Sequence, residues 1–231
     1  MLKKRGYIKL SGLAFILLCL FSVTSALAGD DFRGRITYEI TYEGSQIDLA
    51  EMEQLPAKAE LTVNGPNVRW EMKAGELNQI KITNAEQQSV STKLEIGDEH
   101  YVIHQNRYDI QDELSEMIQP EFEFTDEYKE ILGYECRKVI ATARDQYGER
   151  VTFEIYYTEE IDGFPFHFDL PYNEIPGLML RYEIQSGPLR MQYKATSIRS
   201  RLFVGRRNFR IPDKYQPTTF EELQAKLRGV F

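Results

Sequence analysis

Apolar and polar residues alternate along most of the chain. In residues 32–42, Ile36, Tyr38, Ile40 and Tyr42 occupy every second position, and polar side chains separate them. Successive side chains of a strand point to opposite faces of a sheet. The segment therefore predicts a strand with one apolar face and one polar face.

The same two-residue period returns in shorter segments that turn-forming residues separate. Turn signals stand at 64–67, 97–98, 145–148 and 187–188. The apolar positions of these segments are Leu61, Val63, Val68, Trp70, Met72, Ile80, Ile82, Leu94, Ile96, Tyr101, Ile103, Val139, Ala141, Val151, Phe153, Ile155, Tyr157, Leu178, Leu180, Tyr182, Ile184, Leu189, Met191, Tyr193 and Ala195. Short strands with turn signals about ten residues apart predict one antiparallel sheet that is closed, half-closed or folded into a sandwich.

Two further segments have a helical pattern. Residues 110–119 place an apolar stripe on one face before Pro120 ends the pattern. In residues 219–227, Thr219 and Glu222 have the spacing of a capping box. The two stripes consist of Leu114, Met117 and Ile118, and of Phe220, Leu223 and Leu227. Residues 45–56 are compatible with either a loop or a short helix.

The first 28 residues resemble a signal for export. A basic start is followed by an apolar run at 13–23 and by the small residues Ala26 and Ala28, which suit signal peptidase. A retained anchor is the alternative, but the run is roughly half of the ~20 residues that cross a bilayer. Cys19 follows two leucines in mid-run, which disfavours lipid attachment. We predict cleavage after Ala28, a periplasmic or secreted protein, and a single domain over 29–231.

Removal of this segment makes the chain more acidic. The whole sequence holds 28 Lys and Arg against 36 Asp and Glu, a net charge of -8. Residues 1–28 contain four of the cations and none of the acids, so 24 cations against 36 acids remain, or -12. An acidic balance of this size disfavours nucleic-acid binding.

Only one cysteine, Cys136, would remain after cleavage. An internal disulfide is then impossible, and the hydrophobic core must hold the fold. The flanking residues 134–140 resemble the start of a strand, without a histidine or carboxylate arranged as a catalytic partner. We therefore expect Cys136 to be buried or unreactive.

The sequence contains few of the motifs that carry chemistry. It has no phosphate-binding glycine loop, no Gly-x-Ser-x-Gly, no CxxC and no HExxH. On a strand, His100 and His104 would lie roughly 13 Å apart, too far to bind one metal ion. His167 has no visible partner in the sequence. We predict no cofactor, no metal site and no catalytic residue, with a hydrolase that carries a perturbed carboxylate or histidine in a cleft as a weaker alternative.

Two groups of residues remain as candidate binding residues. The sequence is rich in aromatic residues, which fall largely on the apolar phase of the strands and would line a concave face if the sheet is open. These candidate ligand-binding residues are Tyr38, Tyr42, Trp70, Met72, Phe153, Tyr157 and Met191. A second group could contact anionic lipid head groups or an acidic partner, or could form the ordinary polar side of a strand. It consists of Arg199, Arg201, Arg206, Arg207 and Arg210.

Four elements carry a family resemblance. Residues 172–184, which include Ile175-Pro176-Gly177-Leu178-Met179-Leu180, resemble the signature of the GLPGLI-type exported proteins of Bacteroidetes. Residues 131–138 (ILGYECRK), 156–161 (YYTEEI) and 209–215 (FRIPDKY) are similar to other elements of that family, in the same order. The resemblance covers most of residues 131–215.

The resemblance implies a fold more clearly than a function, because the family is largely uncharacterised. Its architecture resembles the lipoprotein-carrier (LolA-like) half-barrel, which predicts a mainly β protein: one curved antiparallel sheet with one or two short covering helices. In that setting Pro176-Gly177 would belong to the scaffold.

Two functions are favoured on these grounds. The first is an exported, non-catalytic protein of the cell envelope that shelters a lipid or lipoprotein acyl chain in the concave face, in a cavity larger than one aromatic side chain. The second is a structural or interaction protein of the envelope with a filled barrel and no ligand. Membrane contact would be peripheral in either case.

Overall fold

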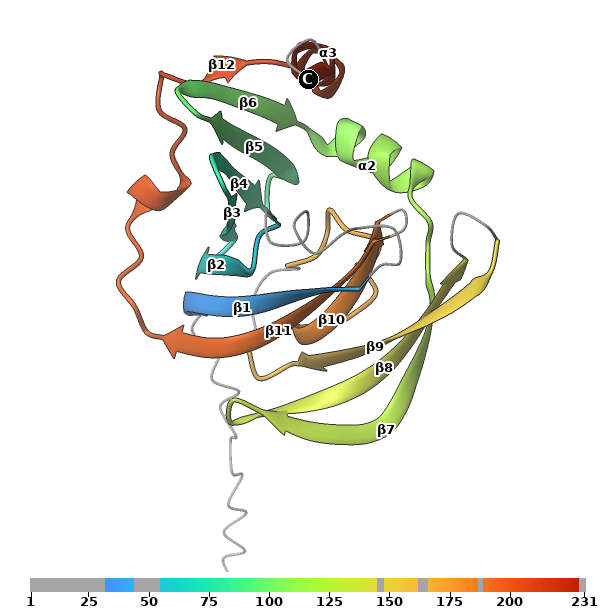
Figure 1. Cartoon of the computed structure of the whole chain (residues 1–231). Coiled ribbons are helices and arrows are strands. Elements are labelled where there is room, and N and C mark those ends of the chain that lie inside the picture. Colours follow the sequence, from blue (N-terminus) through green and yellow to red (C-terminus); the bar gives the residue numbers. More distant parts are fainter. Residues whose placement is uncertain (1–31, 44–54, 145–147, 162–165, 187–188, 229–231) are drawn as a thin grey trace, which may run out of the picture.

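One sheet of 12 strands organises the protein (Figure 1). The computed structural model describes residues 32–43, 55–144, 148–161, 166–186 and 189–228. The first six strands are β1 (Arg33–Glu43), β2 (Lys58–Asn64), β3 (Asn67–Ala74), β4 (Leu77–Asn84), β5 (Ser89–Ile96) and β6 (Glu99–Gln105). The others are β7 (Glu121–Ile131), β8 (Tyr134–Arg144), β9 (Arg150–Thr158), β10 (Leu178–Ser186), β11 (Leu189–Ser200) and β12 (Gln216–Pro217).

The strand order shows two meanders joined edge to edge. It reads β12-β6-β5-β4-β3-β2-β1-β11-β10-β9-β8-β7, so the pairing of β1 with β11 connects the halves. The sheet is curved and does not close, because β12 and β7 lie at its opposite ends. The predicted fold class, a mainly β protein with one curved sheet and two short helices, is confirmed.

The core lies on one face of this sheet, as the alternation predicts. In β1, Ile36, Tyr38 and Ile40 are buried, and their neighbours in sequence are more exposed. The register places Ile40 opposite Tyr193 of β11, so the apolar faces of the two meanders are continuous. The predicted hairpins around 64–67 and 97–98 are present as β2–β3 and β5–β6.

Helix α2 (Arg107–Glu116) is displaced from its predicted bounds. Asn106 caps it by accepting hydrogen bonds from the backbone of Tyr108 and Asp109, so the helix begins three residues earlier than expected. It ends before Met117, and Ile118, expected on its apolar face, is 55% exposed. The cap sets the start of the helix, because it accepts hydrogen bonds from backbone N–H groups that have no partner within the first turn. The apolar stripe is too weak to set it.

Helix α3 (Phe220–Arg228) has the capping box that the sequence predicts. The hydroxyl of Thr219 accepts from the backbone nitrogen of Glu222, and the Glu222 carboxylate accepts from that of Thr219, both at 3.2 Å. The predicted stripe is only partly correct, since Leu223 is buried but Phe220 is 61% exposed. The side chain of Leu227 lies outside the described residues.

An irregular segment, not a helix, covers the concave face. Helix α2 lies against β5 and β6, on the connection that leads from one end of the sheet to β7 at the other (Figure 1). Residues 166–177, between β9 and β10, instead bury Phe166, Tyr172 and Ile175 in the core. The Tyr172 hydroxyl donates to the backbone oxygen of Glu183 at 2.9 Å, which fixes this roof segment on β10. The sequence did not predict this additional cover, because consecutive turns carry no periodic signal.

Within the roof segment, Gly177 has the structural role that was predicted. Its φ is +84°, and a Cβ there would lie 2.2 Å from the backbone oxygen of Thr158. Both the backbone conformation and the close approach therefore require glycine. The predicted signal peptide and most of residues 45–56 lie outside the described residues. Among the residues that are described, no helix has the length and apolar character of a membrane span.

Candidate ligand cavity

A partly enclosed cavity of about 200 Å³ lies between the sheet and the roof segment. Strands β1 to β4, β10 and β11 form its floor and walls, and residues 166–170 form its roof. The residues that line it are Tyr38, Leu61, Val68, Trp70, Met72, Gln79, Lys81, Thr83, Phe166, His167, Asp169, Leu170, Tyr182, Ile184 and Tyr193.

Four aromatic rings form a continuous wall of the cavity. The ring centroids of Tyr38 and Trp70 are 5.2 Å apart, and those of Trp70 and Tyr193 are 5.8 Å apart. Tyr193 in turn stacks on Tyr182 at 4.8 Å with an angle of 5° between the planes. Such pairs add about 0.5–1.5 kcal/mol each to simple burial, so the wall is firmly held.

The hydroxyls of this wall remain protonated. Burial raises the pKa of Tyr38, Tyr182 and Tyr193 well above the ordinary value for tyrosine. The Tyr38 hydroxyl donates to the backbone oxygen of Met179 at 2.9 Å, so its polar end is satisfied inside the protein. The wall thus presents mainly ring faces and edges to the cavity.

The wall beside Trp70 is polar. Gln79, Lys81 and Thr83 alternate along β4 and point into the cavity, because Lys81 pairs in register with the inward-facing Trp70. In the roof, Asp169 forms an ion pair with the Lys81 ammonium group, and its side chain is only 6% exposed. A buried carboxylate needs such a partner, so the pair ties the roof segment to the sheet.

Besides the ion-paired Asp169, two polar atoms that line the cavity, one on β4 and one in the roof, have no hydrogen-bond partner among the described residues. They are the hydroxyl of Thr83 and the Nε2 atom of His167, and both are buried. Burial lowers the pKa of His167 to about 4, Asp169 opposes this shift, and Lys81 adds to it. The imidazole is therefore neutral near pH 7, and the cavity combines an aromatic wall with hydrogen-bonding groups that a bound molecule could satisfy.

The predicted ligand-binding residues divide into two groups. Tyr38, Trp70 and Met72 line the cavity, whereas the other four lie outside its lining: Tyr42, Phe153, Tyr157 and Met191. Phe153 and Tyr157 are buried in the second meander, in the core that they share with Phe166, Tyr172 and Ile175 of the roof segment. The Tyr42 hydroxyl donates a hydrogen bond to the backbone oxygen of Pro56 at 2.6 Å.

The polar wall was missed at the sequence level. The interpretation of β4 relied on Ile80 and Ile82, but these side chains share the outer face with Glu71 and Arg69. Both isoleucines are buried there, outside the main core cluster. Two apolar positions with period two leave the phase of a strand open when both of its faces are covered.

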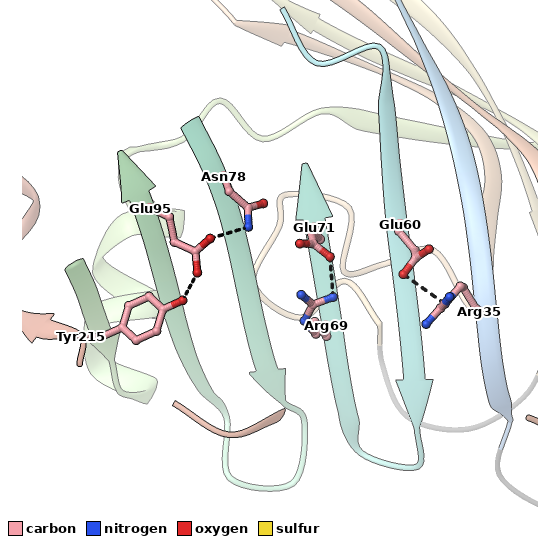
Figure 2. Close-up of polar contacts among 7 residues, drawn as sticks. All are labelled: Arg35, Glu60, Arg69, Glu71, Asn78, Glu95 and Tyr215. Carbon is pink, nitrogen blue, oxygen red and sulfur yellow. Dashed lines mark hydrogen bonds and ion pairs between the residues drawn. The ribbon is translucent and has the colours of Figure 1, made fainter. Parts of the chain in front are cut away.

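The outer face carries a second polar cluster, shown in Figure 2. Glu95 accepts hydrogen bonds from Asn78 at 2.8 Å and from the hydroxyl of Tyr215, and the ion pairs Arg69–Glu71 and Arg35–Glu60 lie on the neighbouring strands (Figure 2). Tyr215 belongs to residues 211–217, the C-terminal strap, which ends in β12 beside β6. The hydrogen bond from Tyr215 to Glu95 therefore fastens the strap to the sheet.

The remaining candidates are not arranged for chemistry. Cys136 is fully buried, and burial raises the pKa of its thiol to about 11, as expected for an unreactive cysteine. His100 and His104 lie on β6, where they contact the backbone of Asp98 and the hydroxyl of Ser91, each at 2.9 Å. Among the described residues, no group of three or more His, Cys, Asp or Glu could hold a metal ion.

No family model matches the chain, and none of the curated proteins does. Two crystal forms of PNGF-II match 85% of this chain at 18% identity, with TM-scores of 0.53 and 0.54. The match covers 33% of the PNGF-II chain, so this protein spans about a third of its length. At this identity the likeness shows a shared fold and nothing about activity.

Two other solved structures are more distant. The lipoprotein LppX of Mycobacterium tuberculosis matches 72% of this chain and 86% of its own, with a TM-score of 0.36 and 7% identity. A DUF1329 family protein from Desulfovibrio piger matches 79% and 91%, with a TM-score of 0.35 and 9% identity. These likenesses are too weak to carry an inference about this chain. Membership of the GLPGLI-type family stays a prediction.

Proposed function

We propose that the protein binds a small amphipathic molecule in the cavity. Its apolar part would lie against the wall formed by Tyr38, Trp70, Tyr182 and Tyr193, and its polar group would face Thr83 and His167. The observation that carries the proposal is the pair of buried, unpartnered polar atoms in the same cavity as this aromatic wall. A buried polar atom without a partner costs about 1–3 kcal/mol, which a ligand or an ordered water would recover.

The volume of the cavity limits the ligand. Benzene fits an apolar cavity of about 150 Å³, and sites for drug-sized molecules have about 300–1,000 Å³. A cavity of about 200 Å³ therefore suits one ring or a short acyl chain. A longer lipid or lipoprotein acyl chain, the ligand expected from the sequence, would require movement of roof residues 166–170.

The predicted export signal supports a role in the cell envelope. On this proposal the protein is periplasmic or secreted, and the ligand reaches it there. N-terminal sequencing of the protein from its natural compartment would then begin at Gly29. A chain that still begins at Met1 would contradict the proposed cleavage.

A structural or interaction protein of the envelope is the second candidate. It is favoured by one observation, the filled concave face of the second meander, where Phe153, Tyr157 and Tyr172 are buried. On this alternative the cavity would hold only water. A protein partner would then bind either the exposed arginines of residues 199–210 or an edge strand of the sheet.

Proton transfer by His167 is less well supported. A hydrolase would place a perturbed histidine in a cleft, and His167 meets that description. A general base works best with a pKa near the operating pH, however. A pKa of about 4 makes His167 a weak base near neutrality, which suits a hydrogen-bonding role.

The single tryptophan permits a direct binding test. Trp70 lines the cavity, so its fluorescence should change saturably when octanoate, a short amphipathic probe, is added. Val68→Phe should weaken octanoate binding by about tenfold or more, because the ring takes up volume in which two or three methylenes of the probe would be buried. Val151→Phe, at a half-buried position outside the cavity, is the control and should bind normally. An unsaturable change, or equal binding by both variants, would contradict the proposal.

A further inference from the structure

The strongest charge feature of the sequence lies outside the cavity. Between Glu183 and Asp213 there is no acidic residue, whereas seven Lys or Arg residues occur. Five of them fall within residues 199–210, which we call the basic tip. In a chain with a net charge of -8, this tip is an isolated positive region.

The arginines of the basic tip are available to a partner. Arg199 is near the end of β11, Arg206 and Arg207 belong to the 3₁₀ helix η1 (Arg206–Phe209), and all five tip arginines are exposed. Within the part of the chain that the structure describes, the salt bridges found involve none of these five. Arg33 of β1 adds to the positive charge, since it lines one recess with Arg206 and Phe209.

An apolar side chain projects from the same tip. Phe203 is 99% exposed, and the adjacent Leu202 is 37% exposed. The backbone next to Phe203 is held in place, because the side chain of Asn64 donates a hydrogen bond to the backbone oxygen of Val204 at 3.0 Å. On the other side, the side chain of Asn208 holds the backbone oxygen of Gly205 at 2.9 Å. Arg201 has a φ of +56°, a costly conformation for a non-glycine residue, where the chain leaves β11.

We propose that the basic tip docks on an anionic phospholipid membrane, with Phe203 and Leu202 inserted between the head groups and the arginines on the lipid phosphates. Aromatic side chains anchor proteins at the membrane interface, and basic clusters bind anionic leaflets. A stable protein partner would need an interface of at least about 1,200 Å², whereas a single projecting aromatic ring surrounded by arginines matches a bilayer surface.

Vesicle flotation tests the proposal with two lipid compositions. The protein is purified in the form in which cells contain it. It should float with vesicles in which phosphatidylglycerol replaces part of the phosphatidylcholine. It should not float with pure phosphatidylcholine vesicles, and added salt should release it. The triple variant R206S/R207S/R210S should bind about a hundredfold more weakly, since each charge contributes about fivefold. A control that removes three other exposed cations, K58S/K73S/R107S, should bind as the natural chain does.

The inserted ring is tested separately. Phe203→Ala should weaken binding to the anionic vesicles by about tenfold, whereas Phe220→Ala, at an exposed ring elsewhere, should have no effect. In Phe203→Trp, the fluorescence of the new tryptophan should shift to the blue when the protein binds anionic vesicles. The emission of Trp70, measured in the natural chain, should not change on vesicle binding. Flotation that is absent, equal on both lipids, or unaffected by the arginine variant would overturn the docking surface. Flotation without a blue shift would overturn insertion, and binding to an acidic protein but not to vesicles would replace the membrane by that partner.

Discussion

At the scale of single residues, His167 links the fold to the proposed function. It lies in the roof between the core and the ion pair of Asp169 with Lys81, and its Nε2 atom has no partner among the described residues. A buried polar atom without a partner costs about 1–3 kcal/mol in the free protein. On the proposed function, a hydrogen bond between the ligand and the Nε2 atom of His167 would offset this cost.

The neutral state of His167 predicts a pH dependence of stability. The folded pKa of about 4 lies below the ordinary 6.5, so the unfolded chain binds a proton first as the pH falls. Stability is then lost from about pH 6.5 down to about pH 4. Between about pH 7 and about pH 5, His167→Gln should lose roughly 2 kcal/mol less of its free energy of unfolding than the natural chain.

Urea unfolding at the two pH values measures this difference. His104→Gln is the matched control, because His104 is exposed and bonded to Ser91, and it should behave like the natural chain. The same loss in all three proteins would show that His167 is not held neutral by burial.

At the scale of elements, the C-terminal strap stabilises one end of the sheet. Residues 216–217 pair with β6 in parallel, and the backbone nitrogen of Thr218 donates to Val102 at 2.9 Å. At the other end, β7 exposes most of its side chains and carries five acidic residues. A short covered edge and a charged edge both discourage pairing with other chains.

The bond between Tyr215 and Glu95 should fasten the strap. Burial works to raise the pKa of Glu95, but hydrogen bonds from Tyr215 and Asn78 hold it below the ordinary value. Tyr215→Phe should therefore lower the free energy of unfolding by about 1–2 kcal/mol and speed hydrogen exchange at Thr218. Tyr108→Phe, at a residue that is 75% exposed, serves as the control and should change neither the free energy of unfolding nor the exchange at Thr218. Unchanged exchange at Thr218 in Tyr215→Phe would mean that other contacts hold the strap.

The elements differ in how far the sequence predicted them. The two-residue period located β1 and the hairpins because one face of each is buried. It missed β7, in which Phe122 and Phe124 alternate with glutamates but a bulge interrupts the period before Tyr128. It also missed the roof, since consecutive turns have no period, and with it His167 and Asp169. Three lining residues could be predicted, whereas the polar wall depends on contacts between segments far apart in sequence.

At the scale of the whole molecule, the cavity and the basic tip lie toward the same end of the sheet. Val68 and Thr83, which line the cavity, pair with each other directly beside the turn 64–67. Asn64 of that turn holds Val204 of the basic tip. Docking of the tip on a membrane would thus bring this end of the cavity close to the lipid surface, where amphipathic molecules are found.

Native mass spectrometry of the protein, purified from its own compartment without detergent, tests the central claim of a ligand in the cavity. The proposal predicts a reproducible extra mass that is extracted by organic solvent and is lost in Val68→Phe but kept in Val151→Phe. A protein that carries no extra mass, and acquires none after incubation with octanoate or a lipid extract, would contradict it and favour the structural alternative.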